Sequence, residues 1–116
     1  MGDRLTDQVD EDAIGAALAV TLLAPMPPLL FMGEEWGSRQ PFPFFCDFKG
    51  DLADAVRRGR RQEYAWAYAL YGDQVPDPLD DATFQAAILD WSAREAADGQ
   101  ARLDWVRRLL AVRARE

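Results

Sequence analysis

The sequence has no histidine, one cysteine and one lysine. Without histidine, neither the usual His/Cys zinc sites nor a Ser-His or Cys-His catalytic relay can be built. A single cysteine, Cys46, cannot form an intrachain disulfide. We therefore predict no metal site, no cofactor and no disulfide. Carboxylates remain the main candidates for acid–base chemistry.

Long apolar runs and basic charge are also scarce. No uninterrupted apolar stretch is long enough to cross a bilayer. Met1 is followed by Gly2-Asp3-Arg4 and further acidic residues, which is unlike a signal peptide. The net charge of −7 argues against sequence-independent binding to nucleic acid. We predict a cytoplasmic chain with neither a membrane nor a nucleic acid as partner.

The chain of 116 residues, 49% of them hydrophobic, is long enough for one domain or part of one. At its centre, the apolar run 29–32 is bounded by prolines and by Gly33, which predicts a short strand buried on both faces. Before it, the spacing of apolar residues predicts a helix from about Ala13 to Ala24, capped by Asp10 or Asp12. A helix, a proline turn and a buried strand form half of a parallel α/β unit.

Further helices are predicted downstream of this strand. One begins at the cap Asp51 and extends to about Tyr71, and a helical turn covers residues 80–84. The last helix starts either at a capping box, residues 92–95, or near Asp98. Its predicted apolar face comprises Leu103, Trp105, Val106, Leu109, Leu110 and Val112, with Arg102, Arg107 and Arg108 on the opposite face.

A single central strand leaves its backbone groups unpaired. Either this chain pairs with another chain, or it is a piece of a larger parallel sheet, which we favour. The predicted fold class is α/β, mostly helical with one buried strand.

Acidic and aromatic residues follow the predicted strand. Gly33 is succeeded by two carboxylates and a tryptophan, and an aromatic loop comes next. Such groups at the C-terminal end of a buried strand are typical of a sugar-binding cleft. The candidate substrate-binding residues are Glu34, Glu35, Trp36, Phe45 and Asp47.

Each candidate also has a structural interpretation. Adjacent carboxylates on an extended segment point in opposite directions, so Glu34 and Glu35 are not expected to face one bond, and hydrogen bonding is favoured over catalysis. Trp36 either stacks on a sugar or packs internally, and Asp47 is a cap or a ligand contact. Phe42, Phe44 and Phe45 are expected to anchor the loop, Trp91 and Trp105 to lie in the core, and Cys46 to be an inert thiol. On the second helix, the arginines are expected to form a solvated face of ion pairs with Asp51 and Asp54; they are Arg57, Arg58, Arg60 and Arg61.

Several motifs occur in a recognisable order. They are PLLFMGEEWG (28–37), PFPFFCDF (41–48), VPDP (75–78), TF (83–84) and LDW (89–91). Together they resemble the C-terminal part of the catalytic barrel of malto-oligosyltrehalose trehalohydrolases, which are α-amylase-type enzymes of glycoside hydrolase family 13. The resemblance implies that residues 1–116 form part of a TIM-type (β/α)₈ barrel. This part would hold the seventh helix, the eighth strand and the eighth helix, with a helical insertion at about 51–91.

The resemblance also implies a chemistry. Such enzymes cleave the α-1,4 bond next to a terminal trehalosyl unit of malto-oligosyltrehalose and release trehalose by a retaining mechanism. Their catalytic carboxylates lie on the fourth, fifth and seventh strands, upstream of every residue here. We therefore expect no catalytic residue in this chain, a fragment that is inactive alone, and binding of the α-glucan only within the full barrel.

Two alternatives remain. In the first, the chain is a free-standing helical interaction module that docks its strand edge on a partner. In the second, it is a piece of another α-glucan-active enzyme such as a branching enzyme. Branching enzymes carry a segment similar to LLFMGEEWG but no recognised counterpart of PFPFFCDF or VPDP, which disfavours the second alternative.

Overall fold

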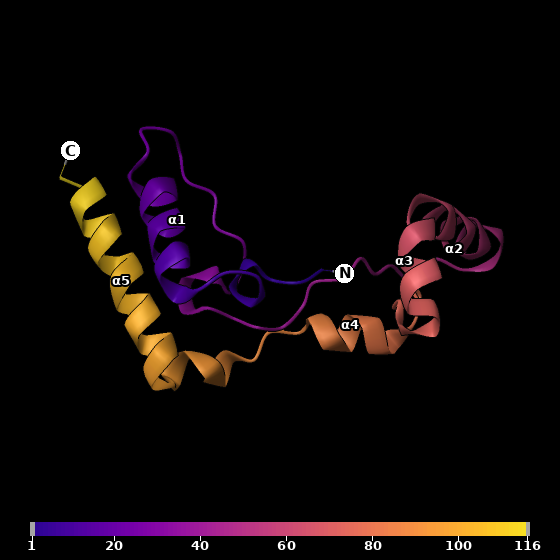
Figure 1. Cartoon of the computed structure of the whole chain (residues 1–116). Coiled ribbons are helices and arrows are strands. Elements are labelled where there is room, and N and C mark those ends of the chain that lie inside the picture. Colours follow the sequence, from indigo (N-terminus) through magenta and orange to yellow (C-terminus); the bar gives the residue numbers. More distant parts are fainter. Residues whose placement is uncertain (1, 116) are drawn as a thin grey trace. The chain divides into compact units, whose positions relative to one another are not determined.

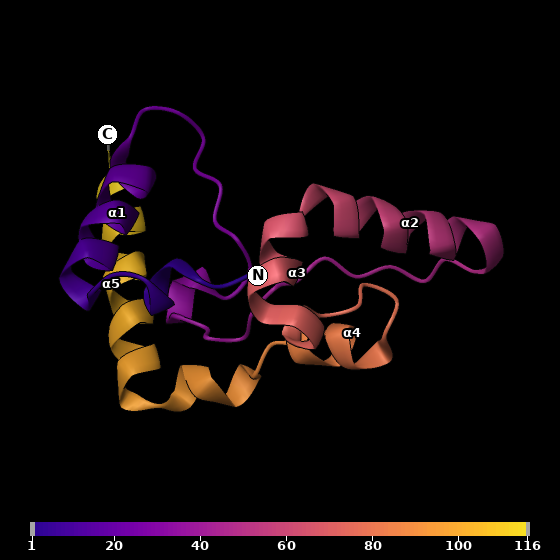
Figure 2. The same cartoon turned by 45° about the vertical axis from the view of Figure 1, so that its right-hand side comes forward.

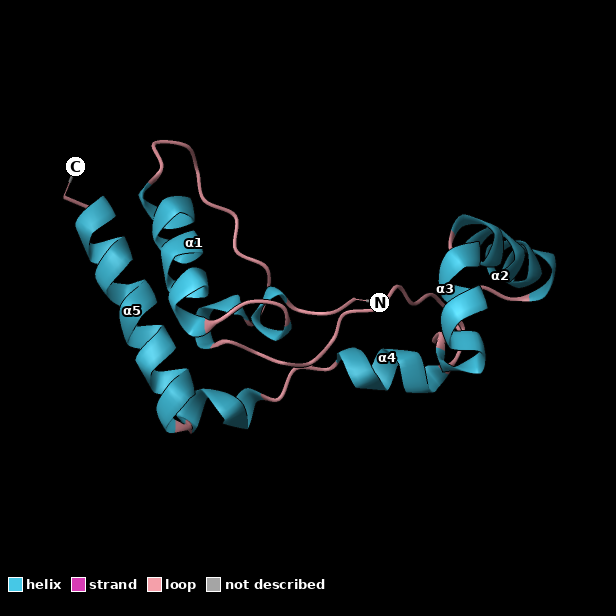
Figure 3. Ribbon diagram, in the orientation of Figure 1, coloured by secondary structure: helices cyan, strands magenta, loops and turns pink. Residues whose placement is uncertain are grey.

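The computed structural model describes residues 2–115, and all regular structure in that range is helical (Figure 3). The α-helices are α1 (Glu11–Leu23), α2 (Gly50–Glu63), α3 (Ala65–Tyr71), α4 (Asp81–Ala87) and α5 (Ala97–Arg113) (Figure 1). Short 3-10 helices are η1 (Leu5–Asp7), η2 (Glu34–Trp36), η3 (Gly72–Gln74) and η4 (Trp91–Glu95).

The chain divides into two compact units, each described by itself. The first, here called the insertion unit, contains the described residues up to Asp3 together with Pro41–Ile88, and therefore α2, α3 and α4. The second, here called the helical-pair unit, contains Arg4–Gln40 and the described chain from Leu89 onward, and therefore α1 and α5.

The predicted buried strand is wrong for this structure. Residues 28–31 have no regular secondary structure, and a turn follows at Met32 and Gly33. Leu29 is 88% exposed, and Phe31 and Met32 are each 42% exposed. A strand exists only when its backbone pairs with a neighbouring strand, and residues 2–115 contain no second strand to supply that pairing.

In the helical-pair unit, α1 and α5 lie side by side although they are far apart in the sequence (Figures 1 and 2). Asp10 caps α1 as predicted, because its carboxylate accepts a hydrogen bond of 2.8 Å from the Ala13 N–H. The two helices bury an apolar cluster between them, which consists of Ile14, Leu18, Leu22, Val106 and Leu109. This cluster is the core of the unit.

The predicted surface of α5 needs correction. Arg102, assigned from the sequence to the polar face, is only 8% exposed and pairs with Glu11 at the start of α1. Leu110 and Val112, assigned to the apolar face, are 41% and 47% exposed. α5 contacts η2 and η4 as well as α1, and the turn at Gly37 lies against the Arg102 guanidinium. The buried side of α5 therefore includes Arg102 and leaves out Leu110 and Val112, unlike the apolar pattern of the sequence.

The structure also differs from the predicted start of the last helix. The predicted capping box at 92–95 is not formed, because η4 occupies Trp91–Glu95 and its cap is Asp90. The Asp90 carboxylate accepts hydrogen bonds from the Ser92 N–H at 2.9 Å and the Ser92 hydroxyl at 2.6 Å. The alternative start of the last helix near Asp98 is confirmed, since α5 begins at Ala97.

In the insertion unit, the long helix predicted from Asp51 to Tyr71 is interrupted. Lys49, not Asp51, occupies the N-cap position of α2 and makes no side-chain cap hydrogen bond; the helix ends at Glu63. Tyr64, with φ −110° and ψ 33°, separates α2 from α3. The predicted turn at 80–84 is the start of α4, where the Asp80 carboxylate accepts a hydrogen bond of 3.0 Å from the Ala82 N–H.

Candidate functional site

The acidic segment sits in a tight turn of the helical-pair unit. Gly33 (φ 88°) and Gly37 (φ 72°) flank η2 in the left-handed region that favours glycine. The Gly33 carbonyl accepts a hydrogen bond of 2.8 Å from the Ser38 N–H, which closes the turn. A Cβ at Gly33 would lie 2.6 Å from the Ser38 Cβ, so no larger residue fits without a shift. Two glycines therefore fix how Glu34, Glu35 and Trp36 are presented.

Glu34 and Glu35 line different pockets. The Glu34 carboxylate accepts a hydrogen bond of 3.0 Å from the Phe31 N–H and lines a pocket of about 150 Å³ together with Arg4 and Arg102. Glu35 lines a separate pocket of about 390 Å³. The structure thus places Glu34 and Glu35 in the linings of two different pockets.

Trp36 is buried, at 5% exposure, and its ring centroid lies 5.0 Å from that of Trp91 at an interplanar angle of 37°. Trp91 was expected in the core but is 57% exposed, and the Arg94 guanidinium lies 5.4 Å from its ring centroid. Trp91 is therefore the more accessible ring of this pair. The pocket beside them is lined by Glu35, Trp36, Trp91, Arg94, Glu95, Gln100, Leu103 and Arg107.

Trp105, the second tryptophan expected in the core, is half-buried against the apolar cluster. Its indole N–H donates a hydrogen bond of 3.2 Å to the Gly15 carbonyl of α1. The ring thus packs beside the core and also joins α5 to α1.

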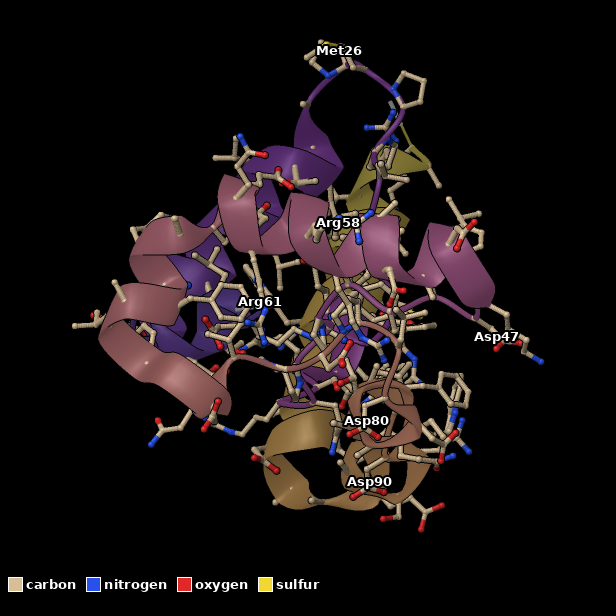
Figure 4. The ribbon with its side chains drawn as sticks, turned by 90° about the vertical axis from the view of Figure 1, so that its right-hand side faces the viewer. Met26, Asp47, Arg58, Arg61, Asp80 and Asp90 are labelled. Carbon is tan, nitrogen blue, oxygen red and sulfur yellow. The ribbon has the colours of Figure 1, made fainter. Side chains whose placement is uncertain are left out.

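The other two candidates belong to the insertion unit. Phe45 is half-buried and makes edge-to-face contacts with Phe42 at 5.6 Å and with Phe84 of α4 at 5.2 Å. Asp47 is exposed and points away from the ribbon near the start of α2 (Figure 4). The ring contacts support the anchoring role expected of the aromatic loop. A hydrogen bond of 2.8 Å from the Cys46 N–H to the Pro78 carbonyl also fixes the loop.

Arg60, predicted to lie on a solvated, ion-paired face, also stacks on two aromatic rings. Its guanidinium lies 4.7 Å from the centroid of Phe44 and 4.2 Å from that of Tyr64, and it pairs with Glu63 at 3.0 Å. The same rings line a pocket of about 320 Å³. The spacing of four residues between Arg60 and Tyr64, one turn of helix, was the signal that could have indicated this stacking.

Ion pairing of the basic stretch on α2 is only partly as expected. Arg57 pairs with Asp54 at 3.8 Å, as predicted, and also with Asp77 at 2.9 Å, far along the sequence. Arg58 and Arg61 project from the same helix (Figure 4). The Arg61 guanidinium lies 5.4 Å from the ring centroid of Tyr68.

Asp77 is electrostatically the most perturbed group of the insertion unit. Partial burial acts to raise the pKa of Asp77, but hydrogen bonds from the Leu79 N–H and Arg57, with the charges of Arg57 and Arg61, hold it below its ordinary value of 3.8. In the other unit, hydrogen bonds from the Ser92 hydroxyl and N–H lower the pKa of Asp90. In both cases the local hydrogen bonds therefore favour the charged form of the carboxylate.

Neither a metal-binding cluster nor a membrane-crossing helix occurs in the described part of the chain. No three of the described Cys, Asp and Glu side chains are grouped so that they could hold a metal ion. No helix between residues 2 and 115 combines the length and apolar character needed to span a bilayer.

Comparisons with known proteins give a consistent picture. A malto-oligosyltrehalose trehalohydrolase from Arthrobacter ramosus is 44% identical over 97% of this chain and 20% of its own length. The one from Mycobacterium tuberculosis is 40% identical over the full chain and 20% of its length, and that from Deinococcus radiodurans is 42% identical over 82% of the chain and 16% of its length. No protein-family profile matches the sequence.

A solved structure agrees with these sequences. A crystal structure from Salmonella typhimurium, provisionally described as an alpha amylase, matches 98% of this chain with a TM-score of 0.87 and 45% identity, over 19% of its own length. This match fits a piece of a barrel protein. The chain spans about a fifth of the length of its relatives. Over nearly its whole length, this chain is therefore similar to malto-oligosyltrehalose trehalohydrolases of the α-amylase type, as its motifs predicted.

Proposed function

We propose that this chain contributes one wall of the substrate cleft of a glycoside hydrolase that releases trehalose from malto-oligosyltrehalose. In this proposal Glu34 and Glu35 of the helical-pair unit and, separately, Phe45 and Asp47 of the insertion unit remain candidate substrate-binding residues. Trp36 is buried against Trp91, so it contributes by packing. The observation that carries the proposal is the similarity to trehalohydrolases at 40–44% identity over 97–100% of the chain.

The chemistry of the described residues supports a binding role rather than a catalytic one. Retaining glycosidases need two carboxyl groups about 5–5.5 Å apart on either side of the scissile bond. Here Glu34 and Glu35 line different pockets. The chain also covers only about a fifth of the relatives, which leaves room for the catalytic carboxylates elsewhere in such an enzyme. We propose that the 116-residue chain alone has no hydrolase activity.

A chimera tests the proposal directly. This chain would replace the matching fifth of the Arthrobacter ramosus trehalohydrolase, and trehalose release from maltosyltrehalose would be measured. We expect a folded, active chimera and no trehalose release by the 116-residue chain alone. A folded chimera without activity would contradict the proposed cleft wall. Trehalose release by the chain alone would contradict its inactivity.

A second candidate function, a free-standing interaction module, is favoured by one observation. Several large apolar side chains of the helical-pair unit are strongly exposed: Val20 at 73%, Met26 at 68% and Leu29 at 88%. Met26 lies at the tip of the loop that follows α1 (Figure 4). Size-exclusion chromatography and thermal melting of the isolated chain separate the two candidates. A monomer with a sharp transition favours the module, whereas aggregation or a broad transition favours a part of a larger barrel.

A further inference from the structure

The helical-pair unit contains a buried arginine, Arg4, that pairs with no carboxylate of the described residues. Arg4 is only 6% exposed. Its Nε donates a hydrogen bond of 2.7 Å to the Gln40 carbonyl, and its Nη1 donates one of 2.9 Å to the Met32 carbonyl. Its Nη2 is buried and has no acceptor, and no carboxylate among residues 2–115 lies within 4.0 Å of the guanidinium.

A second buried arginine shows what is missing. Arg102 is 8% exposed, and its guanidinium pairs with the Glu11 carboxylate. A buried cation is costly unless it is both paired and hydrogen-bonded. Arg4 satisfies only the second condition, through two neutral carbonyls and the ring of Phe31, whose centroid lies 5.0 Å away. An anion is therefore the group that Arg4 lacks.

Space for such an anion adjoins Arg4. It lines a pocket of about 150 Å³, as does Thr6, whose hydroxyl is likewise buried without a hydrogen-bond partner. Most of the remaining wall is apolar and includes Leu18, Leu29 and Leu30. Glu34 also lines the pocket, with its carboxylate bound to the Phe31 N–H.

These features restrict the ligand. A cavity of about 150 Å³ accepts a molecule the size of benzene. The apolar wall favours an apolar body, and the two unpartnered groups of Arg4 and Thr6 favour one hydrogen-bonding anionic end. Glu34 and Arg102 also line the pocket, and Arg102 is already paired with Glu11. One unpaired cation, Arg4, beside the negative charge of Glu34 favours a singly charged anion over a multiply charged one such as phosphate.

We propose that this pocket binds a single carboxylate on a short apolar stem, which pairs with Nη2 of Arg4. An Asp or Glu side chain from a polypeptide segment outside residues 1–116 has this chemistry, and so does a free short-chain carboxylic acid. Trehalose release is not required by the proposal, so the proposal stands even if the proposed function fails.

Propionate and propionamide provide a matched pair of probes. They have nearly the same shape, but only propionate is charged at neutral pH. Each is titrated into the 116-residue chain while amide and arginine side-chain NMR signals are recorded. We expect saturable shifts at Arg4, Thr6 and Leu30 with propionate, and at least about ten-fold weaker binding of propionamide, as loss of a charge-assisted hydrogen bond implies.

Substitutions sharpen the assignment. Arg4→Met should abolish the preference for propionate, and Arg4→Lys, which keeps the charge, should retain part of it. Arg39→Met is the matched control, because the Arg39 side chain is 66% exposed and pairs with Asp7 on the surface. Glu34→Gln should tighten propionate binding, because it removes the one carboxylate that lines the pocket.

The chimera described above distinguishes the two sources of the carboxylate. Propionate binding to the isolated chain but not to the chimera assigns the pocket to an acidic side chain from the remainder of the enzyme. Equal binding to both assigns it to a free carboxylic acid. The proposal is overturned if propionate and propionamide bind the isolated chain alike, or if Arg4→Met and Arg39→Met leave propionate binding equally intact.

Discussion

The two units are built on different physical principles. The helical-pair unit buries five aliphatic side chains between α1 and α5, and Leu22 is 1% exposed. The buried apolar residues of the insertion unit are small: Ala53, Ala67 and Ala87, with Pro43 and Pro78. Its larger apolar side chains meet as aromatic pairs or lie under arginines, as Phe44 and Tyr64 do under Arg60.

This difference indicates where the stability of the chain resides. Burying an aliphatic side chain contributes about 1.5–3 kcal/mol, whereas an exposed cation–π contact contributes about 0.5–1 kcal/mol. The helical-pair unit is therefore expected to unfold locally at a higher free energy than the insertion unit, as amide hydrogen exchange would measure. The predictions below test this ranking.

The largest effect is expected for Leu22→Ala. Removing a fully buried leucine side chain leaves a cavity and should cost about 2–5 kcal/mol. Amide exchange in α1 and α5 should accelerate accordingly, with little change in α2 and α3. Leu70→Ala is the control, because Leu70 of α3 is 68% exposed and its truncation should cost less than about 0.5 kcal/mol. Equal losses for the two variants would refute the contrast between the units.

A smaller loss is expected for Arg113→Met. Arg113, at the end of α5, donates hydrogen bonds to the carbonyls of Leu22, Ala24 and Met26, where α1 ends. A cation at a helix C-terminus satisfies otherwise unpaired carbonyls, so its loss should cost about 1–3 kcal/mol in the helical-pair unit. Urea denaturation measures the loss. Arg115→Met, at an exposed position, should change the midpoint little, and an equal shift would contradict the capping role.

The features that the sequence predicted correctly are those that depend on residues close together in the chain. The start of α1 at the Asp10 cap, its end before the prolines, and the helical turn after Asp80 are each set by residues within one turn of the feature. The similarity to trehalohydrolases was likewise read from contiguous motifs and is confirmed.

What the sequence did not predict depends on distant contacts. The expected strand at 29–32 needs a neighbouring strand, which residues 2–115 do not contain. The buried Arg102 pairs with Glu11, 91 residues away, and the ion pair of Arg57 with Asp77 spans 20 residues. No periodic pattern encodes such pairs. The different pockets lined by Glu34 and Glu35 follow from the turn between Gly33 and Gly37, which was read as the end of a strand.

In the insertion unit, Arg60→Gln should have a modest effect. The substitution removes the cation from between Phe44 and Tyr64, together with the ion pair to Glu63, and should cost about 1 kcal/mol. Amide exchange at the junction of α2 and α3 reports the change. Arg58→Gln, also on α2 but exposed, is the control and should leave exchange unaltered. A loss as large as that of Leu22→Ala would invert the ranking of the units.

The smallest effect is expected from titration of Asp77. Its pKa is lower in the folded chain than its ordinary value of 3.8, so folding favours the charged form. The resulting stability is fully present above about pH 5 and is lost as the pH falls through the ordinary and then the folded pKa. Because the side chain is 42% exposed, solvent screening limits this contribution to less than about 1 kcal/mol. Asp77→Asn should flatten the acid dependence of amide exchange in α4 and leave that of α1 unchanged. α4 is connected to Asp77 because the Thr83 hydroxyl donates a hydrogen bond of 2.6 Å to the Asp77 carbonyl. Parallel pH profiles for the variant and the original chain in α4 would show that this carboxylate does not stabilise the insertion unit, which would then depend on its aromatic and arginine contacts alone.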